Sequence, residues 1–291
     1  MKIFNFEFEG RQRLGYQVQS GSTLSVIAEA RFSGSGAMLR LIQSALAPQE
    51  IARLPVERQV RLEEIRLMAP IERPFRNVWC VGRNYHEHAK ELSATVFKEN
   101  RADEKAWPIV FTKVPECVVG PYDAVHLPGT GISEQIDYES ELAIVIGKQG
   151  KNIDPAQALD HVWGYTIVND VTARDIQMRH KQWDMGKSFD TFCPMGPCLV
   201  TADALPLGKT TVSGLVNGEP RQKAHTDDMI FGLAEIIETV SRGITLYPGD
   251  IIATGTPAGV GMGLNPPRYL KAGDVVRVEI EGIGFIENKF V

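Results

Sequence analysis

The sequence predicts a mainly β protein with some helix, and three observations lead to this fold class. Short runs of β-branched and apolar residues recur along the chain, turn residues separate them, and few segments have helical periodicity. A chain of 291 residues can form one large domain, or one domain with a smaller companion. We therefore expect a small N-terminal α+β domain over residues 1–72 and a larger, mainly β domain over residues 73–291.

The N-terminal domain is expected to contain a hairpin and one helix. Strands are predicted over Lys2–Phe8 and Gly15–Gln19, with their connection at Glu9-Gly10. Apolar residues three and four positions apart predict a helix over Ala37–Ala47. A charged segment with prolines, Pro55–Arg73, then leads into the larger domain. We interpret the small domain as an element for packing or dimerisation.

The larger domain is expected to consist of many strands and few helices. The predicted strands are Val78–Val81, Ile109–Thr112, Leu142–Gly147, Tyr165–Asp170, Cys198–Thr201, Thr211–Val216, Asp250–Gly255 and Val275–Ile280. The predicted helices are His86–Leu92, Pro155–Val162, Ala173–His180 and Met229–Arg242. Gly243 follows the last of them, where glycine commonly ends a helix.

The composition argues against several classes of partner. A hydrophobic content of 43% and a charged content of 23% are ordinary for a globular protein. The net charge of −5, without any basic run, gives no reason to expect nucleic acid or an anionic membrane as a partner. We see neither a signal peptide nor a transmembrane segment. The four cysteines lack Cys-x-x-Cys spacing, which favours reduced thiols in a cytoplasmic protein.

The stretch Asp137–Gly147 carries the strongest indication of function. Glu139 and Glu141 stand two residues apart at the start of an apolar run, so in a strand both point to the same face. Such a pair needs a cation, a lysine or arginine partner, or protonation at a solvated strand end. A second predicted strand ends in Asp170, which could complete a site for a hard divalent cation such as Mg²⁺, Mn²⁺ or Ca²⁺.

Four motifs, in this order, resemble those of the fumarylacetoacetate hydrolase family. They are the Glu-x-Glu of Glu139 and Glu141, Asn-Asp-x-x-x-Arg-Asp over 169–175, Lys-Ser-Phe over 187–189, and the segment Pro248–Pro257. The similarity runs from about Val78 to the C-terminus. It implies a mixed β-sandwich roll, a homodimer, and a metal ion held by the carboxylates of Glu139, Glu141 and Asp170.

The resemblance also implies a catalytic pair, His88 and Glu91. Their spacing places both on one helix face, where the carboxylate can orient the imidazole and raise its basicity. The spacing alone would favour a surface ion pair, whereas the family motif makes His88 a general base for water. His86 is expected at the surface. A segment that includes Ser93–Glu104 could line or cover the bound substrate.

Three further residues match family positions near the substrate. Lys187 would hold a substrate oxygen and stabilise a tetrahedral oxyanion. Gln177 and Thr256 would contact the substrate. These roles follow from the motifs, because a single lysine, glutamine or threonine carries no such information by itself.

Three charged residues keep open roles in the sequence. Arg174 could hold a substrate carboxylate, or it could pair with Asp175 or Glu139 as a structural bridge. Asp137 is either an outer partner of the metal site or a solvated acid at a strand end. Lys113 lies in a segment that resembles one near the active-site entrance in relatives, and we assign it no role.

Two motifs of other enzyme classes do not apply. The glycine-rich run Gly259–Gly263 is followed by Asn-Pro-Pro and not by a helix, which argues against dinucleotide binding. The chain lacks the Gly-x-Ser-x-Gly elbow of serine-dependent hydrolases, so a metal ion and an activated water would have to break the substrate bond.

The favoured function is hydrolysis of a C–C bond in a β-diketo acid, such as an acylpyruvate or a fumarylpyruvate-like compound. Water activated by His88 would attack the distal carbonyl, and the cation would stabilise the departing pyruvate enolate. The alternative is an isomerase, tautomerase or decarboxylase that acts on a hydroxymuconate-type diacid or on oxaloacetate at the same site. A binding protein with an inherited metal site is the third hypothesis.

Overall fold

The fold is mainly β, as predicted, and its strands form one large sheet and one smaller sheet. The computed structural model describes residues 1–19, 21–95, 107–129, 131–179, 182–205 and 207–291. The large sheet has the strand order β4 (Val56–Arg61), β3 (Thr23–Ile27), β2 (Arg11–Gln17), β1 (Lys2–Phe8), β13 (Cys193–Thr201), β11 (Val162–Asn169), β10 (Ser140–Ile146), β16 (Ile251–Ala253), β6 (Val78–Gly82), β7 (Ile109–Lys113).

The remaining strands extend this sheet or face it. Beside the main path, β5 (Arg66–Leu67) pairs with β1 and β8 (Val118–Val119) pairs with β13. A four-stranded sheet, whose strands β14 and β17 contact β10 and β11, has the order β15 (Glu219–His225), β14 (Thr211–Val216), β17 (Val275–Ile280), β18 (Gly284–Lys289). A short pair, β9 (Ile136–Asp137) and β12 (Thr172–Ala173), lies beside the candidate site.

The helices are short and lie at the ends of strands. The α-helices are α1 (Ala37–Gln43), α2 (Pro48–Ile51), α3 (His86–Thr95), α4 (Arg174–Arg179), α5 (Asp184–Lys187) and α6 (Leu233–Ser241). The 3-10 helices are η1 (Ala30–Phe32), η2 (Leu62–Glu64), η3 (Pro115–Cys117), η4 (Pro155–His161), η5 (Ala202–Ala204), η6 (Thr226–Asp228) and η7 (Gly261–Gly263). In the described part of the chain, no helix has both the length and the apolar character needed to cross a membrane.

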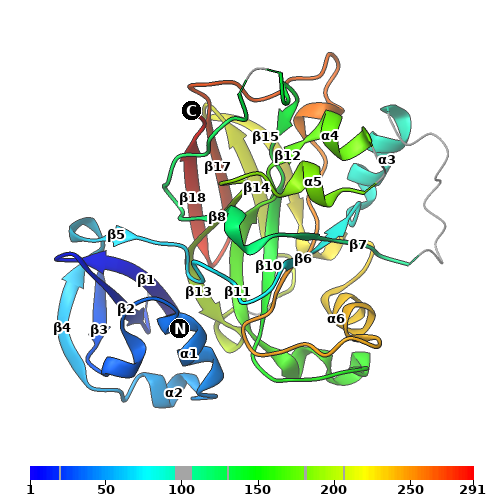
Figure 1. Cartoon of the computed structure of the whole chain (residues 1–291). Helices are drawn as coiled ribbons and strands as arrows, with labels where there is room; N and C mark the ends of the chain where they lie inside the picture. The colour runs from blue at the N-terminus through cyan, green and yellow to red at the C-terminus, as the bar shows by residue number, and fades with distance from the viewer. Residues whose placement is uncertain (20, 96–106, 130, 180–181, 206) are drawn as a thin grey trace.

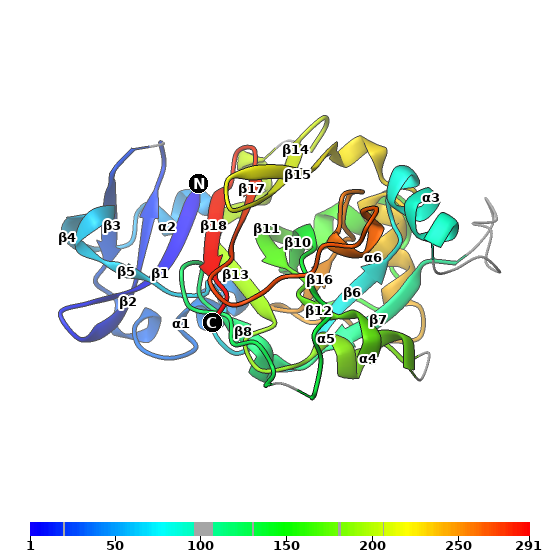
Figure 2. The same ribbon diagram turned by 90° about the horizontal axis from the view of Figure 1, so that it is seen from above.

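The N-terminal hairpin has its turn where it was predicted, at Glu9-Gly10, but its second strand is Arg11–Gln17 and not Gly15–Gln19. Glu9 and Gly10 have φ of 50° and 70°, the left-handed values of the turn type that joins two twisted strands in a two-residue hairpin. Strand β1 then pairs with β13, with Lys2 opposite Val200, so the N-terminal strands continue the large sheet. The division at residues 72 and 73 remains a prediction. Figures 1 and 2 place the N-terminal strands at one end of the molecule and α3, α4, α5 and β7 at the other.

Several predicted helices have other bounds or another helix type in the structure. Helix α6 begins at Leu233 and not at Met229, because Met229 forms a β-bridge with Tyr85. Gly243 follows it with φ of 79°, as predicted for a glycine at a helix end. Helix α1 ends at Gln43, before Ala45 turns to φ of 54°. Helix α4 is described to Arg179 only, and the predicted end at His180 lies outside the described residues. The predicted helix Pro155–Val162 is the 3-10 helix η4.

The four cysteines are buried and free. Cys80, Cys117, Cys193 and Cys198 form no disulfide. Burial raises the pKa of the Cys198 thiol to about 12, so this group stays protonated at neutral pH. These thiols are packed in the interior of the protein, as the absence of Cys-x-x-Cys spacing led us to expect.

Candidate active site

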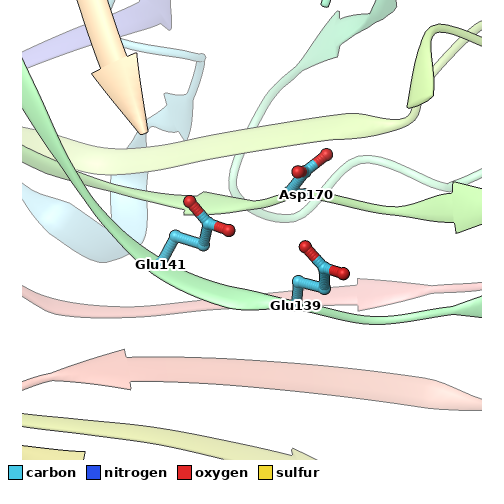
Figure 3. A group of neighbouring side chains, drawn as sticks. All are labelled: Glu139, Glu141 and Asp170. Atoms are coloured by element: carbon cyan, nitrogen blue, oxygen red, sulfur yellow. The ribbon is translucent and has the colours of Figure 1, made fainter. Parts of the chain in front are cut away.

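The pairing of β10 with β11 brings three carboxylates together. Glu139 lies just before β10, Glu141 lies within it, and Asp170 follows β11. The Asp170 N–H donates to the Glu139 carbonyl oxygen at 2.9 Å, which joins the two chain segments at this point. Figure 3 shows the three side chains converging, and one oxygen of each lies within 4.8 Å of the others. All three are buried.

Two basic side chains neutralise part of this negative charge. The Lys187 ammonium lies 2.8 Å from Glu139 Oε2 and 2.8 Å from Asp170 Oδ2. Arg174 Nη1 lies 2.7 Å from Glu139 Oε1. Burial alone would raise the pKa of Glu139, but Lys187 and Arg174 lower it to about 2. Glu139 is therefore ionised and held in place by both cations.

Glu141 differs from the other two carboxylates in its partners. It accepts a hydrogen bond from the Gly255 N–H at 2.8 Å, and no salt bridge reaches it from the described lysines and arginines. Burial, together with Asp170 and Glu139, raises the pKa of Glu141 well above its ordinary value. The buried Glu141 carboxylate therefore has no lysine or arginine paired with it to balance its negative charge. The all-oxygen donor set could hold a hard divalent cation such as Mg²⁺, Mn²⁺ or Ca²⁺.

Lys113 is a site residue to which the sequence assigned no role. Its side chain is fully buried behind Asp170, not at an entrance, and its ammonium lies 2.8 Å from Asp170 Oδ1. It also donates to the carbonyl oxygens of Val171 and Lys187. Burial alone would lower the pKa of Lys113, but Asp170 raises it above the ordinary value. Lys113 thus fixes Asp170 from one side while Lys187 contacts its other oxygen.

His88 and Glu91 form the predicted pair on α3. His88 is 2% exposed, and its Nδ1 lies 3.1 Å from Glu91 Oε2. The other Glu91 oxygen accepts a hydrogen bond from the Gly259 N–H at 3.0 Å. His86 is exposed, as predicted. Apart from the backbone at the end of α3, the predicted substrate segment Ser93–Glu104 lies outside the described residues.

Asp137 is buried at the centre of a network, so the prediction of a solvated acid was wrong. Its carboxylate lies 2.8 Å from Arg174 Nε and accepts N–H bonds from Gly261 at 2.6 Å and Met262 at 2.9 Å. The glycine-rich run therefore contacts this acid and Glu91 through its backbone. Arg174 bridges Asp137 and Glu139, which bears out the structural bridge to Glu139, while Asp175 instead accepts from Ser133 Oγ.

Replacement of Asp137 by asparagine should lower the free energy of unfolding by roughly 3 kcal/mol, because one partner of a buried ion pair is lost. The asparagine NH₂ group would also face N–H donors, whichever way the amide is turned. Urea unfolding of Asp137→Asn measures the loss. The exposed Asp227→Asn variant, which changes the same charge, should unfold like the parent protein. Equal stability of the Asp137→Asn protein would contradict the network.

The predicted substrate residues line one small cavity. His88, Arg174, Gln177, Lys187 and Thr256 all border a space of about 20 Å³ together with Glu139 and Glu141. Arg174 Nη2 is buried and has no hydrogen-bond partner in the described structure. The Thr256 hydroxyl donates to the Ser140 carbonyl oxygen and accepts from Gln222, so its hydrogen bonds are already made within the protein.

A mainly β fold in which converging buried carboxylates share a cavity with a histidine–glutamate pair defines an enzyme with a candidate divalent-cation site. The family model described as "Fumarylacetoacetate (FAA) hydrolase C-terminal" matches residues 77–291. The chain therefore belongs to the fumarylacetoacetate hydrolase family, as its motifs indicated.

Individual relatives agree with this assignment. The chain is 49% identical to oxaloacetate tautomerase YisK of Bacillus subtilis over 229 residues, which cover 78% of this chain and 74% of that protein. It is 45% identical to the human mitochondrial oxaloacetate tautomerase FAHD2A over 260 residues, which cover 87% and 79%.

Solved structures agree over the whole chain. The fumarylacetoacetate hydrolase of Exiguobacterium antarcticum has a TM-score of 0.86 and 42% identity, with 100% of this chain and 99% of that chain covered. The 5-carboxymethyl-2-hydroxymuconate delta-isomerase of Mycobacterium smegmatis has a TM-score of 0.77 and 30% identity, also with 100% and 99% covered. This agreement extends to the N-terminal strands, which the family model does not include.

Proposed function

We propose that this protein catalyses the keto–enol tautomerisation of oxaloacetate with a bound divalent cation, Mg²⁺ or Mn²⁺. The observation that carries the proposal is His88, paired with Glu91, in the same small cavity as the carboxylates Glu139 and Glu141. Relatives 45% and 49% identical are named oxaloacetate tautomerases, which favours the alternative over the C–C hydrolase that the sequence analysis placed first.

His88 would carry the proton between the enol oxygen and C3 of the substrate. Glu91 accepts at Nδ1, so the neutral imidazole keeps its lone pair on Nε2. The base at Nε2 removes the hydroxyl proton of the enol and returns a proton to C3, with no other reactant.

The remaining polar groups would bind and orient the substrate. Arg174 Nη2, buried and without a partner in the described structure, can donate to a substrate carboxylate. Gln177 is held through its Oε1 by Arg174 Nη1 at 3.2 Å, which leaves its NH₂ group as a donor toward the cavity. Lys187 would keep positive charge beside the reacting oxygens. Thr256 would contribute shape more than hydrogen bonds, because its hydroxyl is already bonded.

Glu139, Glu141 and Asp170 would hold the cation. When bound there, it would polarise the keto oxygen and stabilise the negative charge of the enolate. The fit rests on Glu141, a buried carboxylate that forms no salt bridge with a described lysine or arginine. Lys113 and Arg174 would keep Asp170 and Glu139 in place whether or not the ion is present.

Hydrolysis of a β-diketo acid is the second candidate. A cavity of about 20 Å³ has room for one water molecule beside His88. The same imidazole could take a proton from that water, and Lys187 could then stabilise the oxyanion. The homodimer and the cytoplasmic location remain predictions that accompany either candidate.

The enol form of oxaloacetate, added to the protein with Mg²⁺, should lose its ultraviolet absorbance faster than in buffer with Mg²⁺ alone. EDTA should remove the enzymatic part of the rate. Nuclear magnetic resonance of the products should show the keto form without pyruvate. Pyruvate and CO₂ would instead indicate a decarboxylase, and cleavage of acetylpyruvate or fumarylpyruvate in parallel samples would indicate the hydrolase.

A further inference from the structure

The apolar part of the cavity lining comes from two neighbouring strands and one tryptophan. Val81 and Gly82 end β6, Phe111 lies in β7, and Trp183 directly precedes α5. Charged and polar residues, among them the carboxylates, His88 and Arg83, form the rest of the lining. The polar lining residues determine the chemistry of the site. The apolar lining residues can therefore limit the size of the substrate.

The Trp183 indole is seated directly on Gly82. A Cβ atom at residue 82 would lie 2.3 Å from Trp183 Cζ3 and 2.9 Å from Cη2, which no real contact allows. Gly82 does not have a positive φ, so this position requires glycine for space and not for backbone freedom. The last residue of β6 therefore lacks a side chain where the indole covers it.

Neighbouring contacts fix the position of the indole. The Phe111 ring lies 5.2 Å from the Trp183 ring at an interplanar angle of 61°, an edge-to-face arrangement. Asp184, the next residue, accepts a hydrogen bond from Thr112 Oγ1 at 2.7 Å and so ties the start of α5 to β7. The Lys187 ammonium lies 4.9 Å from the centre of the Phe111 ring. These contacts fix the position of the Trp183 side chain in the cavity lining.

We propose that Trp183, seated on Gly82 and against Phe111, sets the upper size of the substrate group that lies beyond the reacting keto acid. The indole lines the cavity on its apolar part, so it occupies space that a bulky acyl or ring-derived group beside the keto acid would need. This inference rests on the proposed function for the location of the reaction, and it narrows the substrate class to short keto diacids.

Replacement of Trp183 by alanine should shift selectivity toward larger substrates. We would measure kcat/KM for the enol of oxaloacetate and for benzoylpyruvate, a β-diketo acid with a bulky distal ring. The ratio of benzoylpyruvate to oxaloacetate should rise at least about tenfold, the usual scale of discrimination by an apolar pocket. The Met185→Ala variant, which changes a 69% exposed neighbour, should keep the parent ratio. An unchanged ratio in Trp183→Ala would overturn the proposal.

A binding experiment separates this inference from the proposed reaction. Calorimetry with Mg²⁺ present would compare oxalate, a short diacid, with benzoylpyruvate in the parent and variant proteins. Benzoylpyruvate affinity should increase relative to oxalate in Trp183→Ala, even if the parent protein fails to turn over oxaloacetate. If the relative affinities do not change, Trp183 does not limit size, whatever reaction the site catalyses.

A second pair of variants tests the contact between the Trp183 indole and Gly82. Gly82→Ala alone should lower the midpoint of urea unfolding, because the added methyl group meets the Trp183 ring. In the Trp183→Ala background the same change should have little further effect, since the ring is absent. Should Trp183→Ala fail to fold, Trp183→Phe provides the selectivity measurement. Equal effects of Gly82→Ala in both backgrounds would contradict the contact and, with it, the proposal.

Discussion

Replacement of Glu141 by alanine should abolish divalent-cation binding and turnover together. Glu141 is 1% exposed and has no cationic partner among the described residues, so it is the carboxylate whose charge most needs the ion. Loss of a direct ligand should weaken Mg²⁺ or Mn²⁺ binding by more than the 10- to 100-fold typical of outer-shell changes. Calorimetric titration with Mn²⁺ and the oxaloacetate assay measure the two effects.

Thermal unfolding provides an independent readout of the same site. A cation that binds the folded state stabilises it, so Mg²⁺ should raise the melting temperature of the parent protein. It should leave that of Glu141→Ala nearly unchanged. The Glu134→Ala variant removes an exposed carboxylate a few residues earlier and should behave like the parent in both measurements. Undiminished Mn²⁺ binding by Glu141→Ala would show that the ion binds to other groups.

The sequence predicts the strands well where local signals are strong. The turn at Glu9-Gly10 and the strand Val275–Ile280 appear where the pattern placed them. The hairpin of β14 and β15 was missed, although Asn217 and Gly218 are the pair most typical of a two-residue turn and have φ of 52° and 77°. Strand β15 contains a proline and four charged or amide side chains, so its composition does not indicate a strand. Only the Asn-Gly turn before it predicts the hairpin.

Helix boundaries depended on contacts that no local pattern contains. The residues from Met229 to Gly232 have apolar character compatible with a helix, yet Met229 pairs with Tyr85, more than a hundred residues earlier. Helix α6 can therefore begin only after this bridge. Its C-terminal end, set by the local preference of Gly243 for a positive φ, was predicted correctly.

In the candidate site too, local sequence patterns indicated some residues, and the roles of others depend on tertiary contacts. Glu139 and Glu141 were identified from their spacing of two in a predicted strand, and Asp170 from its place at the end of a second predicted strand and in a family motif. Lys113 was given no role, because the burial of its side chain follows only from the packing of β7 against the segment after β11. For Asp137, the decisive donors are backbone N–H groups of a distant loop, which side-chain motifs cannot reveal.

Replacement of His88 by alanine should reduce turnover by roughly 10² to 10⁴ while cation binding stays intact. His88 contacts Glu91 and not the three carboxylates in the described structure, so its loss removes the base and leaves the candidate ligands in place. Kinetics with the enol of oxaloacetate and Mn²⁺ titration would be measured on the same preparation.

The matched control for this variant lies two residues earlier on the same helix. His86 is exposed, and His86→Ala should retain parent activity. In catalysis Glu91 would act through the imidazole, so Glu91→Gln should lower turnover less than His88→Ala, and the double variant should turn over substrate about as slowly as His88→Ala alone. Added imidazole should restore part of the His88→Ala rate, because a free base can then reach the space the side chain left. Full activity of His88→Ala would exclude this residue as the proton carrier, and Lys187, which contacts Glu139 and Asp170 and lines the cavity, would be the next group to examine.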